Sequence, residues 1–320
     1  MNIKKIGVLT SGGDAPGMNA VIYSVVKCAK KNNIDVVGIY RGYNGLISGD
    51  VRPLQVDDVV DIMKKGGTIL YSARCKDFEK IDGVKLAVKT CNDNNIDGLV
   101  IVGGDGTFKG ASNIVKQGVS CACIPGTIDN DISCTDYTIG YDSAVNTAVE
   151  MVDKLCDTTA SHDRCSVVEV MGRSSGYIAL GVGISCGANY IVIPEYEFNK
   201  QDLFNNITAA INGGRKHFVV VVAEGILNVS SLAKEIEKEL GVESRATVLG
   251  HVQRGGSPTV KDRVLGVNFG VRAVELLLSG NCGRVIGLKD DALVDYDILQ
   301  GLSIEKEFPK ALYEMARSLY

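Results

Sequence analysis

The stretch Gly98-Leu-Val-Ile-Val-Gly-Gly-Asp-Gly-Thr107 decides the fold of this 320-residue chain. It opens with an apolar run, Gly98–Val102, and a helical pattern follows over Phe108–Gln117. An unbroken apolar run of this length is typical of a strand buried on both faces, as strands of parallel sheets are. Glycines directly after the run permit a tight turn into the helix. The stretch therefore predicts a strand, a loop and a helix of a parallel α/β sheet.

The same alternation of strand and helix recurs along the whole chain. Further strands are predicted at Lys5–Thr10, Val36–Tyr40, Cys121–Ile124, Ser166–Val170, Tyr190–Ile193, Phe218–Ala223 and Thr247–Leu249. Further helices are predicted at Met18–Lys31, Asp142–Thr159, Gln201–Asn212, Ser230–Leu240 and Lys261–Leu278. Buried strands separated by helices predict a doubly wound α/β fold with mostly parallel sheets. Such sheets bind ligands beyond the carboxyl ends of their strands.

The composition narrows the class of protein. A hydrophobic share of 45% and a charged share of 22% are ordinary for a globular enzyme, and the net charge of −4 gives no sign of a nucleic-acid partner. No apolar run approaches the ~20 residues that cross a membrane, and no signal peptide follows Met1. The 10 cysteines form no C-x-x-C pair, and no Cys/His pair completes a zinc site with Cys121 and Cys123, which would share one face of a strand. We expect a cytoplasmic protein with reduced core thiols and no membrane contact.

The stretch Pro125-Gly-Thr-Ile-Asp-Asn-Asp131 carries the clearest sign of chemistry. Thr127, Asp129 and Asp131 stand at alternate positions, so an extended segment would place all three on one face. Two carboxylates on one face suit a pair in which one takes a proton while the other organises a metal or solvent. A turn that hydrogen-bonds to its own Asx side chains remains an alternative.

Two glycine-rich loops follow predicted strands. The first, Thr10-Ser-Gly-Gly-Asp-Ala-Pro-Gly-Met18, is neither G-x-G-x-x-G nor a Walker A loop, yet its backbone amides can approach a phosphate at a helix N-terminus. In the second, Gly103–Thr107, three glycines let the backbone lie against phosphates while Asp105 faces a bridging Mg²⁺. Each loop is also compatible with a tight turn that simply requires glycine.

Basic residues stand downstream, at Arg164, Arg173, Arg245, His251 and Arg254. His251 and Arg254 are three apart and would meet in a helical turn. A single arginine most often forms a surface ion pair of small energy. Arg173 and Arg254, however, lie in glycine-rich loops, which favours anion binding. Together with the phosphate loops and the carboxylate pair, these residues indicate transfer of a phosphoryl group to an anionic substrate.

In these motifs the chain resembles the ATP-dependent 6-phosphofructokinases of bacterial type, over essentially its whole length. The resemblance is carried by Gly7–Asp14, Gly66-Gly-Thr-Ile-Leu-Tyr-Ser-Ala-Arg74, Gly103–Thr107, Pro125–Asp131, Val168-Glu-Val-Met-Gly-Arg173 and Val248-Leu-Gly-His-Val-Gln-Arg-Gly-Gly-Ser-Pro258. It implies two doubly wound α/β domains with the active site in the cleft between them. The ATP-binding domain would comprise 1–139 and 252–305, and the fructose 6-phosphate-binding domain 140–251 and 306–320. The chain would cross between them near Thr138–Gly140 and His251–Gly256.

The resemblance also implies roles for individual residues. Asp129 would take the proton of the sugar 1-hydroxyl, Thr127 and Asp131 would orient that hydroxyl and the metal, and Arg173 would stabilise the transferring phosphoryl group. ATP would be held by Gly13, Arg74, Cys75, Gly104, Asp105, Gly106 and Thr107, with Asp105 on Mg²⁺. Fructose 6-phosphate would be bound by Thr127, Asp129, Met171, Gly172, Arg173, Glu224, His251 and Arg254. A neighbouring subunit would supply Arg164 and Arg245 to its 6-phosphate, which implies a homotetramer.

A second site is implied only in part. Allosteric members of the family bind ADP or phosphoenolpyruvate at an intersubunit site rich in arginine. The matching positions here are Tyr23, Lys27, Val56, Cys156 and Gly213, and Asn189 stands where an acid is usual. Only Lys27 and the run Arg215, Lys216, His217 keep basic or imidazole character. Compensation by Arg52 or Lys154 stays open from the sequence. The sequence therefore predicts weak effector control.

Other functions stay open from the sequence. Pyrophosphate-dependent relatives typically carry aspartate at the position of Gly106 and lysine at that of Gly126, so these two glycines favour ATP. Tagatose 6-phosphate is an alternative acceptor. Diacylglycerol and NAD kinases share the Gly-Gly-Asp-Gly loop but lack Pro125–Asp131 with the later arginines. A non-catalytic nucleotide sensor would need to have lost Asp105 or Asp129, and both are present.

Overall fold

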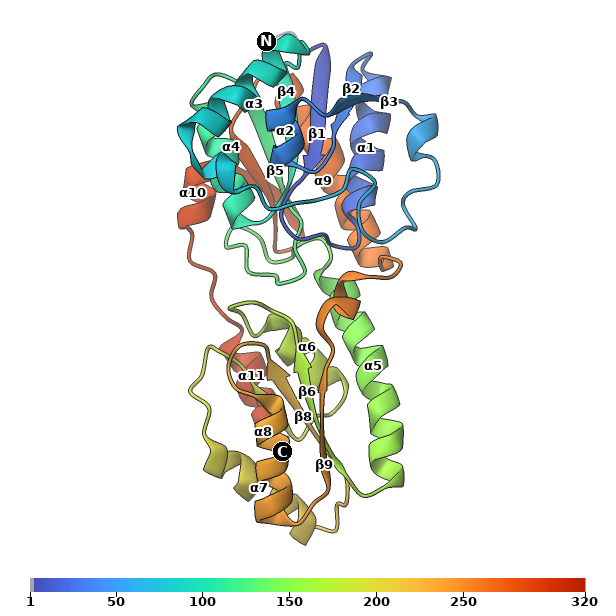
Figure 1. The fold of residues 1–320 in the computed structure, drawn as a ribbon, viewed down its shortest axis with the longest axis vertical. Helices are drawn as coiled ribbons and strands as arrows, with labels where there is room; N and C mark the ends of the chain where they lie inside the picture. Colours follow the sequence, from blue (N-terminus) through green and yellow to red (C-terminus); the bar gives the residue numbers. More distant parts are fainter. Residues whose placement is uncertain (1–2, 320) are drawn as a thin grey trace. The chain divides into compact units, whose positions relative to one another are not determined.

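The computed structural model describes residues 3–319, and contacts divide these into two compact units (Figure 1). The first unit comprises 3–128, 132–143 and 254–306, and the second comprises 129–131, 144–253 and 307–319. The tripeptide 129–131 thus groups with the second unit although its chain neighbours belong to the first. The predicted bounds of the ATP and sugar-phosphate domains concern ligand binding and stay a prediction.

The first unit is built on a seven-stranded sheet of order β11-β10-β5-β4-β1-β2-β3. Its strands are β1 Lys5–Thr10, β2 Asp35–Ile39, β3 Val51–Leu54, β4 Gly98–Gly103, β5 Ser120–Pro125, β10 Arg284–Lys289 and β11 Ala292–Asp297. The five central strands run parallel, while β3 and β11 pair antiparallel at the two edges. Parallel register places the ends of β1, β4 and β5, and hence the two phosphate loops and the Pro125 loop, along one edge of this sheet.

Helices cover both faces of this sheet. On one face α1 (Met18–Lys31) packs against α9 (Val260–Leu278). The 3₁₀ turn η1 (Asp57–Val59) contacts α1. The other face carries α2 Tyr43–Ser48, α3 Ile81–Asp93, α4 Asp105–Val115 and α10 Ile298–Ser303, beside the 3₁₀ turn η2 Lys76–Glu79. Cys121 and Cys123 of β5 both enter the core beneath this second face, as the strand periodicity predicted.

The second unit has an all-parallel sheet of order β7-β8-β6-β9. Its strands are β6 Cys165–Val170, β7 Tyr190–Val192, β8 Phe218–Ala223 and β9 Ser244–Val248. Its helical segments are α6 Tyr177–Ser185, α7 Lys200–Asn212, α8 Val229–Leu240, α11 Lys310–Arg317 and the 3₁₀ helix η3 Gly250–Arg254, together with most of α5 (Tyr141–Ser161). Apolar residues of β6 and β8 form one core with α7 and α8.

The predicted fold class is confirmed, with differences in detail. All eight predicted strands are present, but the last lies at Ser244–Val248 rather than Thr247–Leu249, because an edge strand with a polar sequence has no apolar run to mark it. The helix predicted over Phe108–Gln117 begins earlier, at Asp105. Three strands, β3, β10 and β11, and five helices, α2, α3, α6, α10 and α11, were not predicted. Within residues 3–319, no helix combines the length and the apolar character needed to span a bilayer.

Candidate functional site

The first phosphate loop is a preformed turn after β1. Gly12 and Gly17 have φ values of +91° and +106°, which side chains other than glycine rarely adopt. Three hydrogen bonds fix the loop to the segment before Arg74. The Thr10 hydroxyl donates to the Tyr71 carbonyl (2.9 Å), and the Ser72 hydroxyl donates to the Gly12 carbonyl (2.7 Å). The Gly12 amide donates to the Ala73 carbonyl (3.3 Å). Gly13 lies exposed on this fixed loop. A ligand therefore meets a backbone that is already ordered.

The second phosphate loop ends in the amino terminus of α4. Gly104 is the N-cap, so no side chain caps the first amides of this helix, and Asp105 stands in its first turn. A Cβ built on the exposed Gly106 meets nothing within 4 Å. An uncapped helix terminus with open space before it suits a phosphate group.

Two contacts hold this helix end in place. The buried Tyr43 donates a hydrogen bond to the Thr107 carbonyl (2.6 Å), and its ring stacks on Phe78 with centroids 3.8 Å apart. The Thr107 hydroxyl donates to the Ser11 carbonyl (3.4 Å), which ties the second loop to the first. Sequence reasoning missed Tyr43, which stands directly after Gly42 and outside every predicted strand and helix.

The other residues predicted to hold ATP lie beside the first loop. Arg74 is exposed, and its carbonyl accepts a bond from the Asn44 side chain (3.4 Å). Cys75 is half-buried against the core of the unit. Arg254, predicted for the sugar phosphate, donates to the Asp14 carbonyl (2.9 Å) of the first loop. The helical turn on which the proximity of His251 and Arg254 depended is present as the 3₁₀ helix η3, and the Arg254 guanidinium extends to the first phosphate loop.

The first unit fits a magnesium nucleotide through Asp105. Within 3–319 no group of three or more His, Cys, Asp or Glu side chains is arranged to hold a metal. Mg²⁺ does not require such a group, because in nucleotide sites one or two carboxylates and the substrate phosphates usually supply its protein and ligand oxygens. The carboxylate of Asp105 stands in the first turn of a glycine-lined helix end, where it would fit such a role.

The Pro125 loop departs from the predicted extended geometry. Ile128 and Asp129 form a turn, and Asn130 has φ +51°, so strict strand alternation does not place Thr127, Asp129 and Asp131 on one face. Asparagine tolerates this left-handed conformation better than most residues, which is why the Asx-rich sequence turns. Thr127 stays with the first unit, where its carbonyl accepts the Thr138 hydroxyl (2.7 Å). Asp129 is 6% exposed and groups with the second unit.

Arg173 stands in a constrained loop after β6. Its φ of +59° follows Gly172 at +152°, and the Glu224 carboxylate accepts both of their amides, at 2.7 Å and 3.1 Å. The Arg173 guanidinium lies 3.7 Å from the Asp131 carboxylate, and its side chain is 71% exposed. The cation therefore faces a predicted catalytic acid while staying accessible to a ligand.

Two further side chains near the Arg173 loop are Glu169, whose pKa is shifted, and Gln253, which holds the start of the loop. Burial, together with the charge of Glu224, raises the pKa of Glu169 above its ordinary value. The fully buried Gln253 accepts the Met171 amide (3.3 Å), which fixes the start of the same loop, while His251 is exposed on η3. Gln253 was not singled out from sequence, although it stands inside the glycine-rich motif that contains His251.

Arg164 and Arg245 lie together, at the other end of this sheet. They share the Glu243 carboxylate, with Arg164 at 2.9 Å, and hydrogen bonding from Arg164 lowers the pKa of Glu243. Both arginines border the amino ends of β6 and β9, whereas Met171–Arg173 follow the carboxyl end of β6. A six-residue strand at about 3.3 Å per residue separates the two ends by about 20 Å. Within one subunit, Arg164 and Arg245 therefore lie far from Arg173.

The candidate effector residues fall into both units. Lys27 lies 6.0 Å from the ring centre of Tyr23 on α1, and in the second unit Arg215 donates to the His217 carbonyl while Lys216 lies 3.9 Å from Asp163. Asn189 is buried, and its side-chain oxygen accepts the Val219 amide (3.0 Å). The Asn189 side chain therefore takes part in the hydrogen bonding of the sheet of the second unit.

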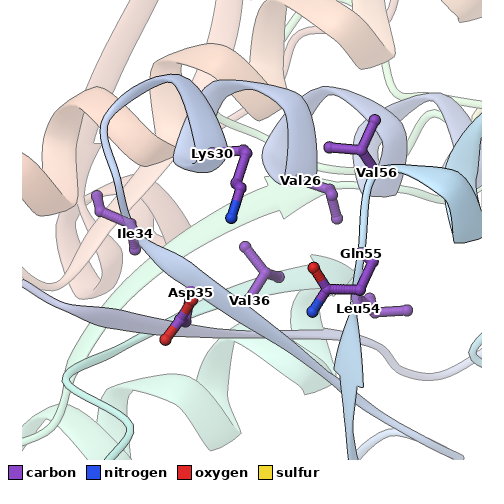
Figure 2. A pocket seen from close by; sticks show the side chains of 8 residues that line it. All are labelled: Val26, Lys30, Ile34, Asp35, Val36, Leu54, Gln55 and Val56. Carbon is purple, nitrogen blue, oxygen red and sulfur yellow. The ribbon is translucent and has the colours of Figure 1, made fainter.

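A small pocket in the first unit lies away from the phosphate loops (Figure 2). It is bordered by the C-terminal half of α1, the start of β2 and the end of β3. The phosphate loops follow the carboxyl ends of β1 and β4, at the opposite edge of the sheet. Its lining residues are Val26, Lys30, Ile34, Asp35, Val36, Leu54, Gln55 and Val56.

Comparison with known proteins agrees with this arrangement. The family model described as phosphofructokinase matches residues 5–277. The chain belongs to the phosphofructokinase family. Among the relatives is the ATP-dependent 6-phosphofructokinase of Bacillus thuringiensis (strain Al Hakam), 47% identical over 317 residues, which are 99% of this chain and 99% of the relative.

Solved phosphofructokinase structures share the fold. That of Saccharomyces cerevisiae superposes with a TM-score of 0.88 at 34% identity, and covers 99% of this chain. That of Pichia pastoris in the T-state gives 0.89 at 36% identity over 100% of this chain. The chain spans 48% and 38% of those two longer chains. The family and its two-unit α/β architecture are thus established for this chain.

Proposed function

We propose that this chain transfers the γ-phosphoryl group of ATP to the 1-hydroxyl of fructose 6-phosphate, which yields fructose 1,6-bisphosphate and ADP, the committed step of glycolysis. The observation that carries the proposal is the open, uncapped end of α4 at Gly104–Gly106, in a chain 47% identical over its length to an ATP-dependent 6-phosphofructokinase. The reaction needs little covalent chemistry from the protein, because phosphoryl transfer is catalysed mainly by positioning and electrostatics.

The first unit would hold the nucleotide. The ordered amides of the two phosphate loops would bind its phosphates, with Gly13, Arg74, Cys75 and Gly104–Thr107 around them. Asp105 would hold Mg²⁺, which would supply positive charge against the phosphates of the nucleotide. Arg254, whose guanidinium donates to the Asp14 carbonyl of the first loop, would bind fructose 6-phosphate.

The second unit would bind and activate the sugar. Asp129 would accept the proton of the 1-hydroxyl, with Asp131 and, from the first unit, Thr127 orienting that group. Arg173, 3.7 Å from Asp131 and largely exposed, would meet the negative charge that develops on the phosphoryl group. Met171, Gly172, Glu224 and His251 would contact the sugar, although Glu224 also holds the loop by two amides.

Pyrophosphate is the less favoured donor. A Cβ on Gly126 would lie 2.7 Å from Val102 Cγ1, so the lysine of pyrophosphate-dependent relatives would displace this side chain. Gly106, by contrast, leaves open the space in which the aspartate of those relatives stands. Both positions support a site that accommodates the larger nucleotide.

We also propose a cytoplasmic homotetramer whose sites are shared between subunits. The support is the separation of about 20 Å between Arg173 and the Arg164–Arg245 pair along β6. If both sets bind one sugar phosphate, a second subunit must supply the pair.

The acceptor is tested by product analysis. Fructose 6-phosphate and tagatose 6-phosphate would each be supplied with ATP and Mg²⁺, and the products separated and their phosphate positions determined by ³¹P NMR. The proposal requires kcat/KM to be higher for fructose 6-phosphate and the new phosphate to be on the 1-oxygen. A preference for tagatose 6-phosphate would assign the chain to the alternative sugar.

A further inference from the structure

The Ser175 hydroxyl joins the Arg173 loop to the backbone of Asp129 by a hydrogen bond. Its side chain is 7% exposed, and its hydroxyl lies 2.8 Å from the Asp129 carbonyl and 3.2 Å from that of Gly172. A hydroxyl donates a single proton, so the shorter contact is the stronger bond. The Ser175 amide also donates to the Gly172 carbonyl (3.0 Å), which closes the turn around Arg173.

The segment that receives this bond is not held by a sheet. Pairing of β5 ends at Pro125, followed by a single bridge from Gly126 to Ile139. Beyond it the chain turns, with Asn130 in the left-handed region. Residues 129–131 nevertheless group by contact with the second unit, to which Ser175 and Arg173 belong. The Ser175 hydroxyl and the Arg173–Asp131 ion pair thus act on this tripeptide from one loop.

The Arg173 loop has support that does not depend on Ser175. Glu224 accepts the amides of Gly172 and Arg173, and Gln253 accepts that of Met171. At the far end of the loop the Glu195 carboxylate accepts the Gly176 amide at 2.8 Å. Loss of the Ser175 hydroxyl therefore leaves the loop folded and removes its bond to Asp129.

We propose that Ser175 is a positioning residue, which fixes the Asp129 backbone so that the carboxylate meets the 1-hydroxyl of the sugar while Arg173 faces the transferring phosphoryl group. This inference rests on the proposed function for the identity of the reaction. The physical basis is that catalysis by positioning is sensitive to small displacements, with about a hundredfold loss of rate for a misplacement of about 1 Å.

The kinetic test uses Ser175→Ala, Ser175→Thr and a matched control. Ser24→Ala also removes a buried hydroxyl that donates to a backbone carbonyl, that of Val21 at 2.9 Å, but in α1 of the first unit. We expect Ser175→Ala to lower kcat by about 10- to 100-fold while KM for ATP changes by less than about twofold. Ser175→Thr keeps the hydroxyl and should retain most of the parent kcat, as should Ser24→Ala.

Two kinetic outcomes overturn the proposal. One is a kcat for Ser175→Ala within about fivefold of that for Ser24→Ala, because a positioning bond must cost more than a structural one. The other is equal loss in Ser175→Ala and Ser175→Thr, which would mean that the hydroxyl is not what matters.

Amide hydrogen exchange gives a readout that does not depend on the reaction. In Ser175→Ala, exchange in a peptide covering 128–133 should be faster than in the parent, while Ser24→Ala leaves it unchanged. Unchanged exchange in Ser175→Ala would refute the positioning role even if the parent proves to phosphorylate a different acceptor. An inactive parent with faster exchange would instead refute the proposed function alone.

Discussion

Replacement of Gly106 by aspartate tests whether the nucleotide phosphates lie at the amino end of α4. Gly106 is the second residue of this helix, is exposed, and has open space around an added Cβ. The fold should tolerate the change, because an acid in the first turn of a helix contributes about 0.3–1 kcal/mol and removal of a helical glycine adds up to about 1 kcal/mol. Any loss of ATP use would then come from the site and not from unfolding.

The expected loss follows from Coulomb's law. A carboxylate about 4 Å from one phosphate charge costs about 1 kcal/mol in bulk water and about 4 kcal/mol at the effective dielectric of surface pairs. These limits correspond to about a fivefold and about a thousandfold loss in kcat/KM for ATP. We expect a value near the middle, about a hundredfold, since the site is partly open to solvent.

Two further variants separate charge from shape and from general effects. Gly106→Asn has nearly the shape of Gly106→Asp without the charge, so the ratio between them measures the electrostatic part. Ser230→Asp places the same charge at the second residue of α8, at an exposed position in the other unit. The assay is steady-state kinetics with varied ATP at saturating fructose 6-phosphate, beside thermal unfolding. An unchanged KM and kcat for ATP in Gly106→Asp would refute the placement of the phosphates.

Four other predictions follow from the same structure. Asp129→Asn should lower kcat by about 10²–10⁴ with little change in substrate binding; near-normal kcat would make Asp129 positional only. A mixed oligomer of Asp129→Asn and Arg245→Ala subunits, refolded together, should regain activity that neither variant has alone, whereas a simple average would contradict shared sites. Phosphoenolpyruvate titration of fructose 6-phosphate saturation should give little shift, because charge-assisted contacts worth about 1.5–3 kcal/mol each are missing together; a strong sigmoidal shift abolished by Arg215→Ala would oppose this. Asp295 is partly buried, and its pKa is held low by Arg284 at 2.7 Å and Arg272 at 2.9 Å; it should stabilise the fold by about 2 kcal/mol above pH ~4, and in urea unfolding the difference between Asp295→Asn and the parent should disappear as the pH falls through this lowered pKa.

The sign of the Asp295 prediction follows from its depressed pKa. The folded state binds the proton less readily than the unfolded state, whose pKa is about 3.9. The stabilisation is therefore complete above that value and is lost as the pH falls through the folded pKa. A difference between parent and variant that persisted at pH ~2 would show that shape, not charge, is responsible.

The sequence predicted the central strands because they are buried on both faces. The runs at Gly98–Val102 and Phe218–Ala223 contain no polar residue and admit few alternatives. The edge strands β3 and β11 face solvent on one side and carry Arg52, Pro53 and Asp295, so no apolar run marks them. Helix α6 is apolar all round and shows no amphipathic period, which is why it was missed.

The sequence predicted which residues form the candidate site better than it predicted how they are arranged. The motifs identified the two phosphate loops and the Pro125 loop, because glycines and acidic residues directly after a buried strand are typical of ligand-binding loops. Asn130 was read as part of an extended run, but its left-handed backbone turns the chain and moves Asp129 to the second unit. Ser175, Gln253 and Tyr43 act through single hydrogen bonds to distant backbone atoms, and those partners are set only by the tertiary fold.

The central claim is that the open end of α4 receives ATP and that the second unit presents the 1-hydroxyl of fructose 6-phosphate. The most direct measurement is a coupled assay of fructose 1,6-bisphosphate formation, with Mg²⁺ and fructose 6-phosphate held constant and with ATP or pyrophosphate as the donor. We predict ready turnover with ATP and a kcat/KM for pyrophosphate at least about a hundredfold lower, equivalent to a difference of about 2.8 kcal/mol in transition-state binding. Equal or better turnover with pyrophosphate, or no turnover with ATP, would contradict the account.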